Sequence, residues 1–288
     1  MKMDFIELLK VIFQGIIEGI TEWLPISSTG HMLLVDEFMK MDMTEAFKDM
    51  FLVVIQFGAI LAVIVIFWKQ LWPIKLQKLK RSSGHALVIE RSILSMWAKV
   101  IVGCLPAAVI GFLFDDIITR YLYAPYVIAA MLIIYGIGFI VIETWNKKRT
   151  PKFNSINEIT YQSVLIIGAF QALAMIPGTS RSGATIIGAL LLGISRTTAA
   201  EYTFFLAIPT MLGASGFKLL KYFLNTGFGF TSSEIIALVV GMTVAFIVSV
   251  IVIKFLMSYI KKHDFKIFGW YRIALGVIVL CLLPILSN

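Results

Sequence analysis

Two apolar stretches, each interrupted in its middle by small and polar residues, decide the fold of this chain. Residues 5–34 read FIELLKVIFQGIIEGITEWLPISSTGHMLL, and residues 161–194 read YQSVLIIGAFQALAMIPGTSRSGATIIGALLLGI. The interruptions, PISSTG at 25–30 and PGTSRSG at 177–183, break the hydrogen-bond ladder of a helix. A broken helix survives at membrane depth only where protein packs around it or where it lines a wet cavity. We therefore predict two re-entrant helical hairpins.

The sequence around these hairpins is typical of membrane-spanning helices. Of 288 residues, 59% are hydrophobic and only 15% are charged, with a mean hydropathy of +0.91. A soluble domain is about 25% charged, so soluble enzymes and disordered chains are excluded. A spanning helix needs about 17–25 mostly apolar residues. The segments of this kind are about 50–68, 97–114, 124–142, 203–220, 235–253 and 268–286. We expect an all-α polytopic membrane protein with six full spans.

The net charge of +8 is explained by loops on one side of the membrane rather than by a nucleic-acid partner. Basic residues are concentrated in the segments 69–91, 144–160 and 254–272, which the positive-inside rule places in the cytoplasm. Few basic residues occur in the outer loops, near 32–46, 115–123 and 221–234. With these sides, the first hairpin enters from outside and the second from the cytoplasm.

An internal repeat agrees with this topology. At an offset of 153 residues, Gly15-Ile-Ile-Glu18 lies over Gly168-Ala-Phe-Gln171, and Ser27-Ser-Thr-Gly30 lies over Ser180-Arg-Ser-Gly183. Three spans follow each hairpin, so the two halves have opposite orientations. We predict one integral membrane domain, 1–288, made of two inverted repeats at about 1–150 and 151–288. In such folds the broken helices meet near the midplane and form the site.

The first hairpin carries carboxylates, hydroxyls and an imidazole. Glu18 and Glu22 are four residues apart, so they share one helical face. Ionisable residues within an apolar stretch are rare and usually functional. The break that follows adds Ser27, Ser28, Thr29 and His31. The alternative is a hydrated carboxylate pair near the membrane surface with a structural histidine.

The second hairpin carries an arginine, Arg181. An unpaired guanidinium at membrane depth costs about 2.5–3.5 kcal/mol, so it needs an anionic partner. Glu18, Glu22 and a ligand phosphate are all candidates, because a guanidinium matches phosphate oxygens well. A helix that begins near Ser182 would point its positive end at the same anion. An internal Arg–Glu pair joining the two halves is the alternative, and it is compatible with ligand binding. Weaker candidates for polar roles are Gln56, Gln171, Arg196 and Glu201.

Together the two hairpins predict an anion site with an acid–base group and hydroxyl nucleophiles beside it. Hydrolysis of a phosphate on a membrane lipid needs charge stabilisation, proton transfer and an attacking oxygen. The residue types in the two breaks supply all three.

Two segments also resemble a known family. Glu18-Gly-Ile-Thr-Glu22-Trp-Leu-Pro-Ile-Ser-Ser-Thr-Gly-His31 and Pro177-Gly-Thr-Ser-Arg-Ser-Gly-Ala-Thr185 closely resemble the signature segments of the undecaprenyl-diphosphatase family, which confers bacitracin resistance. The resemblance covers essentially the whole chain. It implies a hydrolase of the bacterial inner membrane that converts undecaprenyl diphosphate to undecaprenyl phosphate and inorganic phosphate. This reaction recycles the lipid carrier for peptidoglycan and other envelope polymers. The family fold has inverted repeats and two re-entrant hairpins, with a site that opens outward.

The resemblance further implies roles for single residues. Glu18 and Glu22 match two essential carboxylates, and Ser28, His31 and Arg181 match the essential serine, the essential histidine and the pyrophosphate-binding arginine. The polar lining is matched by Ser27, Thr29, Thr179, Ser180 and Ser182.

Activity in the family is associated with a divalent cation, Mg²⁺ or Ca²⁺, for which Glu18 and Glu22 are the natural ligands. In the expected mechanism, Ser28 or an activated water attacks the terminal phosphorus and His31 handles the proton. Glu22 orients His31 or holds the cation, and Arg181 neutralises the developing charge. The partners are then the polyprenyl diphosphate lipid and the bilayer; the oligomeric state stays open, with a homodimer as one candidate.

Two other readings compete with this one. The phosphatidic-acid-phosphatase type needs an Arg-Pro or Lys-Pro motif upstream and a histidine six residues after its Ser-Arg; this chain has no Arg-Pro, and Ile187 stands six residues after Arg181. A lipid or anion transporter would share the inverted-repeat architecture. It would need Arg181 but no hydroxyl–imidazole pair, so the proximity of Ser28 and His31 favours the enzyme.

Overall fold

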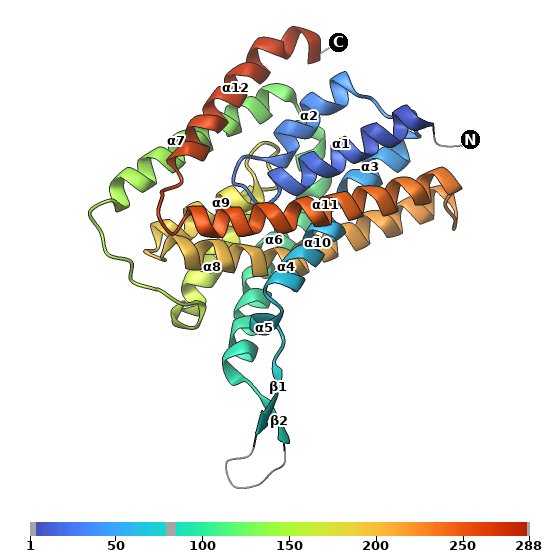
Figure 1. The fold of residues 1–288 in the computed structure, drawn as a ribbon. Helices are drawn as coiled ribbons and strands as arrows, with labels where there is room; N and C mark the ends of the chain where they lie inside the picture. The colour runs from blue at the N-terminus through green and yellow to red at the C-terminus, as the bar shows by residue number, and fades with distance from the viewer. Residues whose placement is uncertain (1–3, 79–84, 287–288) are drawn as a thin grey trace.

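The computed structural model describes residues 4–78 and 85–286, and these form a helical bundle (Figure 1). The helices of the first half are α1 (Phe5–Thr21), α2 (Ser28–Phe38), α3 (Glu45–Val54), α4 (Gln56–Ile66), α5 (Trp68–Leu71), α6 (Arg91–Leu122) and α7 (Pro125–Asn146). Those of the second half are α8 (Tyr161–Leu173), α9 (Arg181–Leu191), α10 (Arg196–Thr226), α11 (Ser232–Tyr259) and α12 (Lys266–Leu286), with a short 3₁₀ helix at Ile156–Glu158 before them.

Five helical segments of the described chain are long and apolar enough to cross a membrane. They are Glu45–Ile66, Arg91–Phe114, Pro125–Asn146, Arg196–Thr226 and Ser232–Tyr259, and each contains most or all of one predicted span. The sixth predicted span, 268–286, is helical as part of α12, although its last side chains lie outside the described residues. The chain is thus an all-α polytopic membrane protein, as predicted.

Each broken apolar stretch forms a pair of short helices whose outer ends lie together. At the start of α1, Lys10 Nζ donates to the carbonyl oxygen of Lys40, just beyond α2, at 2.6 Å. Before α8, the amide of Lys152 donates to the carbonyl oxygen of Gly193, just beyond α9, at 2.7 Å. The chain therefore enters and leaves each pair at one face of the bundle, as a re-entrant hairpin requires.

The two breaks have the same backbone geometry. Ser27 and Ser180 have φ angles of 74° and 69°, a region that residues with a side chain rarely adopt. Each serine caps the helix that follows it: Ser27 Oγ accepts from Gly30 N at 3.4 Å, and Ser180 Oγ accepts from Gly183 N at 3.2 Å. The cap offsets part of the backbone strain. The capped helices, α2 and α9, have 11 residues each.

The two sequence halves are interlocked by packing. Helix α1 packs against α11, whereas α8 packs against α6, so each hairpin rests on a long helix from the other half. Helices α7 and α12 lie side by side, and α10 lies along α3 and α4 (Figure 1). Glycines permit these approaches: a Cβ atom on Gly168 of α8 would overlap the carbonyl oxygen of Gly103 in α6.

A small sheet departs from the all-helical expectation. Strands β1 (Ile74–Lys78) and β2 (His85–Ile89) pair antiparallel, with Ile74 opposite Ile89, and project from the bundle (Figure 1). This hairpin falls within the basic segment 69–91, for which the sequence predicted only a loop.

Loops gather on two faces, as the charge pattern requires. Two turns into α6, Lys99 Nζ donates to the carbonyl oxygens of Ile156 at 3.1 Å and Asn157 at 2.6 Å, which joins the start of α6 to the segment 144–160. On the other face, the ring of Tyr222 packs edge-on against Phe47, with centroids 6.4 Å apart. This contact joins the predicted outer segment 221–234 to the start of α3, at the residue directly after the predicted outer segment 32–46.

Candidate active site

An ion pair joins the two hairpin breaks. Glu22 ends α1 and Arg181 begins α9, and Arg181 Nη2 lies 2.8 Å from Glu22 Oε1. Both side chains are largely buried, at 8% and 13% exposure. Arg181 Nη1 also donates to the carbonyl oxygen of Thr203 on α10 at 3.2 Å. Of the two carboxylates considered from the sequence, Glu22 and not Glu18 forms the ion pair with Arg181.

The same carboxylate holds the predicted nucleophile. Ser28 Oγ donates to Glu22 Oε2 at 3.3 Å, so Glu22 lies between Ser28 and Arg181. The Nε atom of Arg181 is buried and has no hydrogen-bond partner among the described residues. Because a buried donor of this kind is costly to leave unpaired, Nε is the free donor of the site for a ligand oxygen.

Glu18 lines a cavity next to this cluster. The cavity has a volume of about 310 Å³, which is within the range of small-molecule sites, and Ser28, Thr29 and Gln56 line it with Glu18. Apolar walls come from the start of α7, at Pro125 and Ile128, and from Met32 and Leu52. Glu18 is 1% exposed, and its Oε1 atom has no partner in the described structure. A polar head group and an apolar tail could both be accommodated here.

His31 faces a residue that the sequence analysis did not select. Its Nδ1 atom lies 2.7 Å from the carbonyl oxygen of Ser27, and its Nε2 atom lies 2.7 Å from the hydroxyl of Tyr271 on α12. A carbonyl only accepts, so Nδ1 carries the hydrogen and Nε2 accepts from Tyr271. The structure shows no contact between Glu22 and His31, since Glu22 is directed to Arg181 and Ser28. The expected role of Glu22 in orienting His31 is therefore not seen.

Arg272 of α12 is a second residue that the sequence analysis missed. It is fully buried, and its guanidinium donates to Pro25 O at 3.2 Å in one break and to Gly178 O at 2.7 Å and Thr179 O at 2.8 Å in the other. One side chain thus satisfies carbonyl groups of both breaks. In the sequence, Arg272 counts among the basic residues of the loop segment 254–272, and its burial corrects that assignment. The signal was present in the sequence, since Arg272 also falls inside the predicted span 268–286.

The remaining hydroxyls divide into structural and free groups. Ser27 and Ser180 cap their helices, and Ser182 Oγ donates to the carbonyl oxygens of Glu22 at 3.2 Å and Leu24 at 3.4 Å. These three bind the breaks to their helices and to each other. By contrast, Thr179 Oγ1 is buried without a partner in the described structure, and Thr29 lines the cavity.

Three of the weaker candidates have separate roles. Arg196 pairs with Glu143, with Nε 2.8 Å from Oε1. Helix α9 separates Arg196 from the second break. Gln171, the repeat counterpart of Glu18, is buried, and neither atom of its amide has a partner in the described structure. Gln56 lines the cavity together with Glu18.

The oxygen atoms around Glu18 are candidate ligands for Mg²⁺ or Ca²⁺. The described residues contain no group of three or more His, Cys, Asp or Glu side chains placed to hold a metal ion. Glu18 fits nonetheless, because its free Oε1 and the hydroxyls of Ser28 and Thr29 are the hard oxygen donors that these cations prefer. Phosphate oxygens of a substrate would have to complete the coordination.

Comparison with known proteins assigns the chain to a family. The model of the family described as Bacitracin resistance protein BacA matches residues 11–278. An undecaprenyl-diphosphatase of Enterococcus faecalis is 62% identical over 99% of this chain and 100% of its own length. Undecaprenyl-diphosphatases of Lachnoclostridium phytofermentans and Desulfitobacterium hafniense are 60% and 58% identical, each over 96% of this chain and over 97% and 96% of their own lengths. The chain therefore belongs to the bacitracin resistance protein family.

Proposed function

We propose that this chain hydrolyses undecaprenyl diphosphate to undecaprenyl phosphate and inorganic phosphate, the activity for which its relatives are named. The observation that carries the proposal is the buried cluster of Arg181, Glu22 and Ser28 beside the cavity lined by Glu18. The reaction returns the lipid carrier to peptidoglycan and envelope-polymer synthesis, and it accounts for bacitracin resistance.

The cluster supports a direct displacement at the terminal phosphorus. Arg181 binds the diphosphate oxygens through its free Nε and neutralises the charge that develops on them. The N-terminus of α9 favours the same anion. Ser28 Oγ attacks phosphorus while Glu22 accepts its proton, and the bond to the bridging oxygen of the lipid phosphate breaks. Water then hydrolyses the phosphoserine, which releases inorganic phosphate and restores Ser28. If water attacks in place of Ser28, inorganic phosphate is released in one step.

His31 and Tyr271 extend the site on the side of α12. The hydroxyl of Tyr271 donates to His31 Nε2, and His31 makes no hydrogen bond to Ser28 in the described structure. We assign to His31 and Tyr271 the transfer of protons at the edge of the site, in place of direct proton removal from Ser28. A divalent cation, Mg²⁺ or Ca²⁺, would be held by Glu18, with Glu22 as the second carboxylate, and would neutralise part of the charge on the diphosphate.

The proposed setting is the bacterial inner membrane, with the basic loops in the cytoplasm and the site open to the outer side. We interpret the domain, 1–288, as two inverted repeats. The matched break geometry at Ser27 and Ser180 and the crosswise packing of the hairpins support that interpretation.

The test is phosphate release from undecaprenyl diphosphate by the purified protein in detergent. Wild type should turn over, whereas Arg181→Ala should lose at least about 100-fold in rate, the usual cost of removing an oxyanion donor. His31→Ala should also be impaired, and Arg91→Ala, at the exposed start of α6, should match wild type. A well-folded wild type without turnover, with or without Mg²⁺ or Ca²⁺, would refute the proposal. A lipid-translocation assay would then test the transporter reading.

A further inference from the structure

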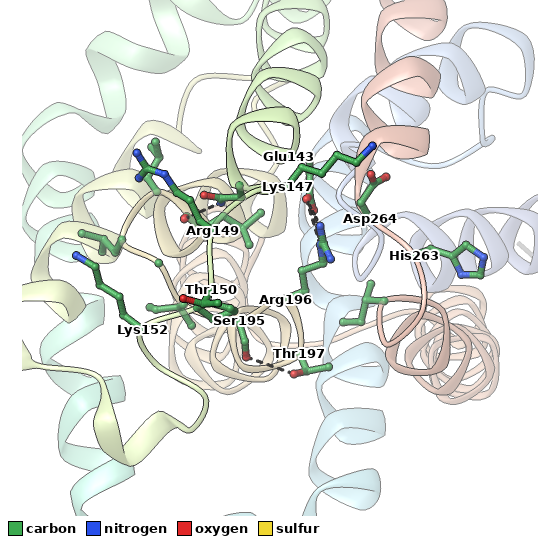
Figure 2. A pocket seen from close by; sticks show the side chains of 18 of the residues that line it. Glu143, Lys147, Arg149, Thr150, Lys152, Ser195, Arg196, Thr197, His263 and Asp264 are labelled. Atoms are coloured by element: carbon green, nitrogen blue, oxygen red, sulfur yellow. Dashed lines mark hydrogen bonds and ion pairs between the residues drawn. The ribbon is translucent and has the colours of Figure 1, made fainter.

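A second cavity, here called the basic cavity, lies at the far end of α9 from Arg181 (Figure 2). Its volume is about 640 Å³, and it shares no lining residue with the cavity beside Glu18. The 11 residues of α9 separate Arg181 from the basic cavity by about 15 Å. The lining comes from four places: the end of α7, the chain after it, the α9–α10 turn and the α11–α12 connection.

Positive charge dominates the lining. Six basic residues line the cavity from two segments, the chain after α7 and the α11–α12 connection: Lys147, Arg149, Lys152, Lys261, Lys262 and Lys266. The seventh, Arg196, is neutralised by Glu143, as the dashed lines in Figure 2 indicate. The buried carboxylate of Glu143 also accepts from the amide of Phe265 at 3.0 Å. After this pair is set aside, Asp264 is the remaining carboxylate among the lining residues.

Among the described residues, none of these six basic side chains forms an ion pair with a carboxylate. Within residues 4–78 and 85–286, no carboxylate oxygen lies within 4.0 Å of the ammonium group of any of the five lysines. Arg149 instead lies over the ring of Trp145, at 3.4 Å from its centroid. The positive-inside rule explains why cations occur in these loops, but it does not require them to surround a hollow. Like charges held around one cavity repel each other until an anion occupies it.

Helices α10 and α12 begin at lining residues, Arg196 and Lys266, but their first turns already have acceptors. Ser195 Oγ accepts from Thr198 N at 3.4 Å, and Asp264 Oδ1 accepts from Lys266 N at 3.2 Å. The positive potential of the cavity therefore comes from its basic side chains.

Apolar side chains at the rim indicate that the anion belongs to a lipid. Leu191 lines the cavity and is 42% exposed, and Ile267 and Trp270, in the first turns of α12, are 57% and 62% exposed. Basic pockets between membrane helices at the cytoplasmic face are suited to lipid head groups, whose chains then lie along such apolar surfaces. We propose that the basic cavity binds the phosphate group of an anionic membrane lipid. This inference is independent of the proposed hydrolase activity.

The test compares lipid binding by native mass spectrometry of the full-length protein in detergent. Phosphatidic acid should bind at least about tenfold more tightly than phosphatidylcholine, which carries a neutral head group. The triple variant Lys147→Gln, Lys152→Gln, Lys266→Gln should lose this preference, because it removes three of the six cations and takes at least one from each of the two segments. Arg181→Ala should keep it, which separates the basic cavity from the active site.

Two further variants control for net charge and folding. Lys69→Gln, Lys75→Gln, Arg91→Gln removes the same charge from another basic segment outside the cavity and should keep the preference. Lys147→Arg, Lys152→Arg, Lys266→Arg keeps the charge and should also bind phosphatidic acid.

Inorganic phosphate, titrated alone by calorimetry, distinguishes the two sources of phosphate. If inorganic phosphate binds through the same three lysines and wild type shows no preference for phosphatidic acid, the cavity is a site for free phosphate. The lipid part of the proposal would then be wrong. Equal binding of phosphatidic acid by wild type and the glutamine triple variant, with no lysine-dependent phosphate binding, would overturn the proposal.

Discussion

Arg181 and Arg272 are buried guanidinium groups with different partners, and the difference separates their roles. Arg181 is paired with a carboxylate beside the predicted nucleophile, which suits a ligand-binding group, whereas the Nε atom lacks a partner in both arginines of the described structure. Arg272 is surrounded by carbonyl oxygens from both breaks, which suits a group that holds the backbone in place. Broken helices leave carbonyl groups without helical donors, and Arg272 supplies them.

Replacement of Arg272 by Met should destabilise the protein strongly. The carbonyl groups of Pro25, Gly178 and Thr179 would lose their donor, at about 1–3 kcal/mol for each group left unsatisfied. Thermal unfolding in detergent measures the loss. Arg149→Met is the matched control, because that exposed side chain packs on Trp145 and should change stability by less than about 1 kcal/mol. Equal unfolding midpoints for the two variants would contradict the assigned role.

Tyr271→Phe should slow turnover without abolishing it. The variant keeps the ring that stacks on His31 and removes only the hydroxyl that donates to Nε2. Loss of one neutral hydrogen bond, about 0.5–1.5 kcal/mol, corresponds to about a 2–10-fold fall in kcat. KM should be unchanged, because Tyr271 does not line the cavity. Steady-state kinetics measures both constants, with Tyr161→Phe, a change in an exposed tyrosine of α8, as the control. If Tyr271→Phe and Tyr161→Phe had the same kcat, the Tyr271–His31 hydrogen bond would have no role in turnover.

At the scale of helices, close approach depends on glycine. A Cβ atom on Gly58 of α4 would overlap the backbone carbonyl group of Met242 in α11, a clash that no side-chain adjustment can relieve. Helix α11 in turn packs on α1, which carries both site carboxylates. The position of Glu18 and Glu22 therefore depends on a backbone contact between α4 and α11, one helix away from α1.

Gly58→Ala and Gly213→Ala should consequently have opposite effects. Gly58→Ala must push α4 and α11 apart and should lower the thermal midpoint. Gly213 lies in α10, and a Cβ atom added there would have no neighbour within 4 Å, so alanine should be neutral or stabilise the helix by about 0.5–1 kcal/mol. Thermal unfolding of both variants under one condition is the measurement. If Gly58→Ala unfolded at the same temperature as Gly213→Ala or at a higher one, helices α4 and α11 could move apart without loss of stability, and the prediction would be wrong.

At the scale of the whole molecule, the loops on each face carry the topology. The basic cavity brings the segments 144–160 and 254–272 together, and Lys99 joins the start of α6 to the first of them. On the opposite face, the segment 221–234 contacts Phe47, the residue directly after the segment 32–46. All three basic segments thus share one face, which the charge rule assigns to the cytoplasm.

Cysteine accessibility in intact bacterial cells should confirm this assignment. In a background with Cys104 and Cys281 replaced by alanine, Asn225→Cys should react with a membrane-impermeant maleimide. Lys148→Cys should react only after the cells are made permeable. Both native positions are exposed, so burial does not account for a lack of labelling. The reverse pattern would invert the orientation and place the basic cavity outside.

The sequence by itself determined the membrane class, the two breaks and the polar and charged side chains that lie in them. These features are local, because apolar length, the Pro, Gly and Ser clusters and the charged residues of the breaks can each be read within a few turns of one helix. Five spans, the helix formed by the sixth segment and both broken stretches agree with this reading. The strands at 74–78 and 85–89 were missed, because the charge of that segment masked its short β pattern.

Only the tertiary structure decided which groups meet. Glu22 and Arg181 are 159 residues apart in the chain, and Arg272 and Pro25 are 247 apart. No local pattern distinguishes Glu22 from Glu18 as the partner of Arg181, or shows that Ser182 binds the opposite break while Thr179 remains free. These choices depend on how the hairpins pack on long helices from the other half, because a buried polar group takes the partner that packing brings within reach.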